Sequence, residues 1–83
     1  EERKAEQRRE QRRARQITHI EEEISELEAS LRDIEREMGD PGLARDHLAL
    51  EQLHDQATKI RGDLKERYAT WEALHEEEAA ESE

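Results

Sequence analysis

The chain of 83 residues contains no cysteine, no phenylalanine, one proline, three glycines and only two aromatic side chains. Without cysteine it forms no disulfides, so nothing in it requires an oxidising compartment. No apolar run approaches the roughly 18–20 residues that a membrane span needs, and the charged N-terminal stretch is unlike a signal peptide. A soluble, cytoplasmic protein without membrane contact is expected.

Charged residues make up 46% of the chain and apolar residues 31%, which leaves too little apolar surface for a globular core in so short a chain. The net charge of −10 is unevenly distributed. Residues 1–16 hold seven Lys/Arg and four Glu, a net of +3, so the remaining residues carry −13. A coiled coil fits this composition, because it needs only two apolar positions per heptad.

Apolar residues recur at spacings of three and four in two stretches, with one step of seven in the second, where Arg67 interrupts it. The first stretch comprises Ile17, Ile20, Ile24, Leu27, Leu31, Ile34 and Met38. The second comprises Leu53, Ala57, Ile60, Leu64, Trp71 and Leu74. Such spacing is typical of helices that bury a narrow stripe against one partner helix. The sequence therefore predicts an all-α fold, a two-helix antiparallel coiled-coil hairpin with an Asp-Pro elbow.

The turn between the two stretches contains Gly39-Asp40-Pro41-Gly42. Gly39 suits the residue after a helix, Pro41 blocks helix continuation, and Asp46 suits the N-cap of a second helix. We predict a helix over 17–38, an elbow over 39–46 and a helix over 46–78. Residues 1–16 are predicted to form a basic helical linker, and residues 79–83 a disordered acidic tail.

The register of the hairpin follows from matching the two apolar stretches. In an antiparallel pair, the numbers of facing residues add up to a constant. A sum of 91 places Leu31 opposite Ile60 and Ile20 opposite Trp71, whereas a sum of 84 places Trp71 opposite Arg13. We therefore predict the sum of 91. Because both stretches are used within one chain, a monomer is expected.

The basic segment is the candidate binding site. Its predicted nucleic-acid-binding residues are Lys4, Arg8, Arg9, Arg12, Arg13 and Arg15. Arginine favours phosphate because its planar guanidinium donates two parallel hydrogen bonds. The alternative is a solvated helix whose arginines pair with its own glutamates and with residues 76–78.

No catalytic residue, metal site or cofactor is expected in this segment. Two paired helices leave no desolvated cleft, and the four histidines offer no set of three or four convergent ligands. Trp71 lies on the apolar stripe and is expected to pack in the core. The chain also lacks a Gly-x-x-x-x-Gly-Lys-Ser/Thr run, so it has no phosphate-cradling loop.

The heptad helix, the Asp40-Pro41 elbow and the ending Tyr68-Ala-Thr-Trp71-Glu72-Ala-Leu74 resemble the C-terminal domain of ABC-F ATPases. The resemblance covers nearly the whole chain. It implies cytoplasmic proteins with two upstream ATP-binding domains that act on ribosomes during translation. In the Uup-like branch it implies a DNA-binding hairpin.

The resulting prediction is a non-catalytic accessory domain of an ABC-F ATPase that contacts DNA or ribosomal RNA through basic residues. ATP hydrolysis is expected only in the upstream domains of the same protein. The main alternative is a structural coiled-coil spacer or protein-interaction hairpin that does not bind nucleic acid. A third is the tRNA-facing arm of an aminoacyl-tRNA synthetase.

Overall fold

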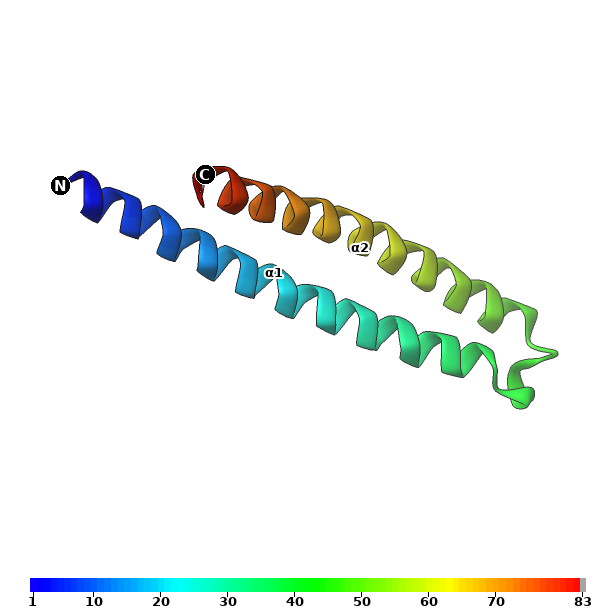
Figure 1. Ribbon diagram of the computed structural model, residues 1–83. Helices are drawn as coiled ribbons and strands as arrows, with labels where there is room; N and C mark the ends of the chain where they lie inside the picture. The colour runs from blue at the N-terminus through cyan, green and yellow to red at the C-terminus, as the bar shows by residue number, and fades with distance from the viewer. Residues whose placement is uncertain (83) are drawn as a thin grey trace.

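The computed structural model, which describes residues 1–82, contains two long helices joined by a short turn. Helix α1 spans Glu2–Met38, the 3₁₀ helix η1 spans Pro41–Leu43, and α2 spans His47–Ser82. The helices run antiparallel and lie side by side in a rod of 65 × 15 × 15 Å (Figure 1). The predicted all-α hairpin is confirmed.

The core is a narrow stripe between α1 and α2. Its buried apolar residues are Ile17, Ile20, Ile24, Ala57 and Leu64. The other stripe residues are half-buried, because a two-helix rod has no third element to cover the sides of the seam. All the buried α1 residues lie between 13 and 24, so this helix is best covered around its middle.

The turn forms as the local chemistry predicts. Asp40 has the extended backbone (φ −69°, ψ 120°) that a following proline imposes, and its side chain accepts a hydrogen bond of 2.9 Å from the Gly42 amide. Asp46 caps α2 by accepting a bond of 3.1 Å from the Ala49 amide. Gly39 directly follows α1, as expected, and its φ of −85° is right-handed.

α1 begins well before the first buried residue, and α2 continues well past the last one. Residues 2–16, predicted as a linker, form the first turns of α1 without a break, and their role as a linker stays a prediction. α2 continues through Ser82, whereas its end was predicted at residue 78 and a disordered tail from 79. Glu83, the last residue of that tail, lies outside the described residues. No described helix is long and apolar enough to cross a membrane.

The contacts between the helices favour the register with a sum of 91. Arg67 binds Glu23 and Trp71 binds Glu21, pairs whose numbers sum to 90 and 92. The pair of Arg61 and Glu35 sums to 96. All three sums lie well above 84, the value for the alternative register, in which one helix is shifted by a heptad of seven residues.

A disulfide test checks this register. The chain has no cysteine, so introduced pairs report without background. Cysteines at Leu31 and Ile60 should crosslink under mild oxidation, whereas cysteines at Leu31 and Leu53 should not, because a disulfide needs Cα atoms within roughly 7 Å. Mobility on a non-reducing gel gives the readout. Crosslinking of Leu31 with Leu53 alone would contradict the register.

Candidate nucleic-acid interface

Four of the predicted binding residues share one exposed face of α1. They are Lys4, Arg8, Arg12 and Arg15, and we call them the outer stripe. At about 100° per residue they lie within roughly 80° of one another around the helix axis. A shallow surface groove runs between the side chains of Arg8, Arg12, Arg15 and His19. The helix thus presents its basic side chains in one row.

The outer stripe is exposed along its whole length. Within the described part of the chain, none of its four side chains forms an ion pair within 4.0 Å. The stripe ends at His19, because the next residues on the same face are Glu22 and Glu26. On this face of α1 the basic residues are therefore confined to the first five turns.

Arg13 occupies a different environment from the other predicted residues. It is only 7% exposed and points towards α2, about 140° around the axis from Arg8. Its Nη2 lies 2.5 Å from Glu81 Oε1, and its Nε lies 3.7 Å from Glu77 Oε2. Its Nε makes no hydrogen bond within the described residues. Arg13 is thus enclosed by the last two turns of α2 and takes no part in the outer stripe.

The pKa values of Glu81 and Arg13 reflect the contact between these two residues. The hydrogen bond from Arg13, followed by the charges of Arg13 and Arg9, lowers the pKa of Glu81 below its ordinary 4.5, although burial opposes the shift. The bond to Glu81 likewise raises the pKa of Arg13. Arg9 therefore lies within electrostatic reach of Glu81. We call Arg9 and Arg13 the inner pair.

One partner of Arg13 was anticipated from the sequence, and the other was missed. The alternative paired the arginines with residues 76–78, and Arg13 does lie 3.7 Å from Glu77, but Glu81 was not foreseen. Glu81 belongs to the segment predicted to be disordered, because an acidic run at a helix C-terminus is locally unfavourable. Cross-helix ion pairs with α1 offset that cost. The available signal was the position of Arg13, which continues the apolar stripe of Ile17 and Ile20 towards the N-terminus and so must face α2.

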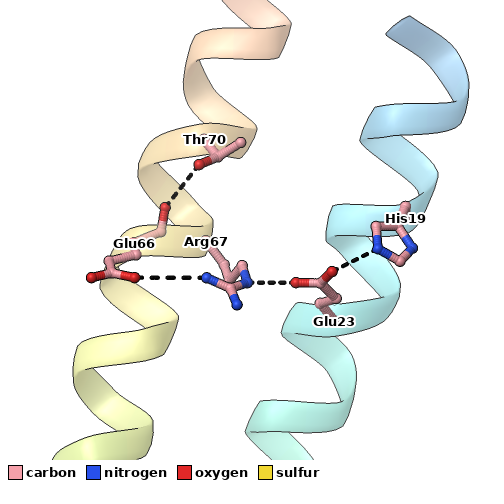
Figure 2. Close-up of polar contacts among 5 residues, drawn as sticks. All are labelled: His19, Glu23, Glu66, Arg67 and Thr70. Carbon is pink, nitrogen blue, oxygen red and sulfur yellow. Dashed lines mark hydrogen bonds and ion pairs between the residues drawn. The ribbon is translucent and has the colours of Figure 1, made fainter. Parts of the chain in front are cut away.

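A second polar layer crosses the hairpin near its middle. Glu23 of α1 lies between His19, at 2.7 Å, and Arg67 of α2, at 2.5 Å; Arg67 also reaches Glu66 at 3.7 Å (Figure 2). The hydrogen bond from Arg67 is the main cause of a lowered pKa of Glu23. Arg67 interrupts the apolar stripe of α2, so polar contacts take the place of apolar packing at this layer. His19, which lies next to the outer stripe, pairs with Glu23.

The two aromatic residues lie on α2 and are bound to carboxylates of α1. Tyr68 donates a hydrogen bond of 2.9 Å to Glu28, and the Trp71 indole donates one of 3.3 Å to Glu21. The Trp71 ring also packs edge-on against His75, with ring centroids 4.4 Å apart. Trp71 is half-buried in the helix interface, and neither aromatic ring lies on the face of the outer stripe.

No group of three or more potential metal ligands converges among the described residues. The four histidines are distributed along the rod, and the two that form ion pairs do so within their own helices. The grooves of the hairpin are open surface features between charged side chains. The candidate binding feature of the surface is therefore the exposed positive charge at one end of the rod.

The chain matches a known protein-family model. The family model described as ABC transporter C-terminal domain matches residues 5–76, which include most of the outer stripe, the elbow and most of α2. No curated protein and no solved structure matches the chain significantly. The family match confirms the resemblance to the C-terminal domain of ABC-F ATPases. With its two-helix fold and most of its length covered, the chain belongs to the ABC transporter C-terminal domain family.

Proposed function

We propose that the chain is a non-catalytic accessory domain of an ABC-F ATPase that contacts nucleic acid, DNA or ribosomal RNA, through the outer stripe. The observation that carries the proposal is the row of four exposed cationic side chains on one face of α1, which form no ion pair with the part of the chain that the structure describes. ATP binding and hydrolysis belong to upstream domains of the same protein in the cytoplasm. The family match supports the accessory role, since the domain is small, helical and unlike a catalytic ATPase domain.

The geometry of the outer stripe suits a phosphate backbone. Lys4 and Arg15 are separated by about 16 Å along the helix axis, at 1.5 Å per residue. That length covers several successive phosphates of a strand, which advance by about 3.4 Å per nucleotide. Guanidinium groups bind phosphate oxygens through two parallel hydrogen bonds, so arginine is the favoured residue for such contacts.

Recognition through the outer stripe should not depend on base sequence. Base readout requires side chains that reach into a groove, and base stacking requires exposed aromatic rings. The chain has two aromatic rings, and both lie on α2, hydrogen-bonded to Glu28 and Glu21. Contacts from the outer stripe are therefore directed to phosphates.

The rival function is a structural spacer or protein-interaction hairpin. It draws support from the net charge of −13 outside residues 1–16, which repels nucleic acid. The acidic surface begins where the outer stripe ends, so a nucleic acid that binds the stripe has to leave the rod beyond His19. In both functions we expect the chain to be monomeric, because α1 and α2 use their apolar stripes on each other.

Titration of the chain against a fluorescein-labelled 20-base-pair DNA duplex tests the proposal. With four phosphate contacts, the plot of log K against log salt should have a slope of about −3.6, since each contact contributes about −0.9 on duplex DNA. Fluorescence anisotropy at several salt concentrations gives the slope, and an RNA duplex of the same sequence compares the two targets. Absence of binding to both duplexes at low salt would favour the structural spacer.

A further inference from the structure

The basic residues of α1 lie in two different environments. The outer stripe faces solvent, whereas Arg13 of the inner pair is enclosed by the last turns of α2, and Arg9 beside it is exposed. Those turns carry the glutamates Glu76, Glu77, Glu78 and Glu81, which we call the acidic end of α2. The chain thus holds a carboxylate cluster of its own beside its proposed phosphate-binding segment.

The contact between them has the chemistry of a phosphate contact. A carboxylate and a phosphate both accept parallel hydrogen bonds from a guanidinium, so one arginine cannot serve both fully at the same time. Arg13 is nearly enclosed, and its closest partner atom, Glu81 Oε1, is 2.5 Å away. Nucleic acid can reach Arg13 only if the acidic end of α2 moves away from α1.

The movement concerns only the last turns of α2, because the contact with Arg13 lies at the end of the hairpin. The inner pair and the acidic end lie at the open end of the hairpin, where α2 terminates while α1 continues past it (Figure 1). Beyond His75 the described part of α2 has no large apolar side chain, so its last turns are held to α1 mainly through charge. Helix ends of this kind open at low free-energy cost without unfolding the rest.

We propose that the acidic end of α2 is an internal competitor for the nucleic-acid site: it occupies Arg13 and thereby limits binding to the outer stripe. This inference rests on the proposed function and adds its regulation. Neutralising the acidic end frees Arg13 for one further phosphate. An opened hairpin end then binds nucleic acid more tightly and with a steeper salt dependence than the closed one.

The test combines the double variant Glu77→Gln/Glu81→Gln with Arg13→Gln. In the titration with the 20-base-pair DNA duplex, the double variant should bind about 3–10-fold more tightly at low salt than the unaltered chain. Its slope should be steeper by about 0.9, the value for one added contact. Arg13→Gln should remove much of the gain when it is added to the double variant, and it should weaken the unaltered chain by much less.

The control has the same change in net charge at the other end of the rod. Glu37 and Glu51 are exposed near the elbow, so Glu37→Gln/Glu51→Gln raises the charge by two without touching the inner pair. Circular dichroism monitors helix content, and the single variant Glu81→Gln replaces the double variant if the latter loses helix. Equal gains in the control, or an unchanged slope in the double variant, would overturn the inference.

The outcomes also separate the inference from the proposed function. If the unaltered chain binds the duplex and the double variant binds it no better, the internal competition is refuted while the outer stripe stands. If neither binds at low salt, both proposals fail. If Arg13→Gln weakens the unaltered chain as much as it weakens the double variant, Arg13 already contacts nucleic acid in the closed hairpin, and the acidic end is no competitor.

Discussion

Replacing Arg8, Arg12 and Arg15 by glutamine should lower the affinity of the chain for duplex DNA by about tenfold or more at low salt. These side chains form most of the outer stripe and make no ion pair among the described residues, so their loss removes phosphate contacts and nothing else. The slope of log K against log salt should fall from about −3.6 to about −0.9, because only Lys4 remains. Fluorescence anisotropy measures both quantities.

A matched control separates contact from net charge. Arg32, Arg45 and Lys59 are exposed and lie outside the basic segment, so replacing them by glutamine removes the same three charges elsewhere on the rod. This control variant should retain the affinity within about threefold, since charges separated from the interface by more than a Debye length of about 10 Å are screened. An equal loss in both variants would show that affinity follows total charge, which contradicts a defined interface.

The second large effect concerns stability. Ile24→Ala should lower the free energy of unfolding by about 2–5 kcal/mol, the usual range for removing most of a buried isoleucine side chain. Ile24 is 6% exposed, the lowest value among the large apolar residues of the core. The higher helix propensity of alanine offsets only a few tenths of a kcal/mol. Urea denaturation followed by circular dichroism at 222 nm gives the change.

Glu22→Ala is the control for this substitution. Glu22 lies two residues away on the same helix but is exposed, so its replacement should change the unfolding free energy by no more than about 0.5 kcal/mol. A small rod without a third helix has little stability in reserve, so Ile24→Ala should leave much of the chain unfolded at 37 °C. If Ile24→Ala unfolds like the unaltered chain, the core does not lie at this layer.

The two variants test whether stability and binding lie on different faces of α1. The apolar stripe around Ile24 faces α2, and the outer stripe around Arg12 faces solvent. A helix of 3.6 residues per turn allows this separation, because residues three and four apart return to the same face. Binding residues can therefore be replaced without loss of the fold. The exception is Arg13, which lies on the packed face and is enclosed by α2.

Much of the fold was predictable because it depends on local chemistry. The alternation of three- and four-residue spacings defines the packed face of each helix, and Pro41 with the capping residues Asp40 and Asp46 defines the turn between them. The register followed too, since aligning two apolar stripes of known spacing leaves few alternatives. The family match over residues 5–76 agrees with the Asp-Pro elbow and the Tyr-x-x-Trp-Glu-x-Leu ending.

Other features depended on contacts between residues far apart in the chain. Local propensity predicted that α2 ends at Glu78, because an acidic C-terminus opposes the helix dipole. The helix instead continues to Ser82, and Glu81 meets Arg13 across the hairpin. A charge that is unfavourable for its own helix is stabilised by a neighbour 68 positions away, which no local pattern reveals.

The sequence by itself determined the fold class, the elbow and the position of a basic segment, since each follows from spacing, backbone chemistry or composition. The tertiary structure alone decided which arginines of that segment are free. Arg12 and Arg13 are neighbours with the same side chain, but one faces solvent and the other is enclosed by Glu77 and Glu81. The physical reason is that a guanidinium's availability depends on the charges that packing brings within a few ångströms of it.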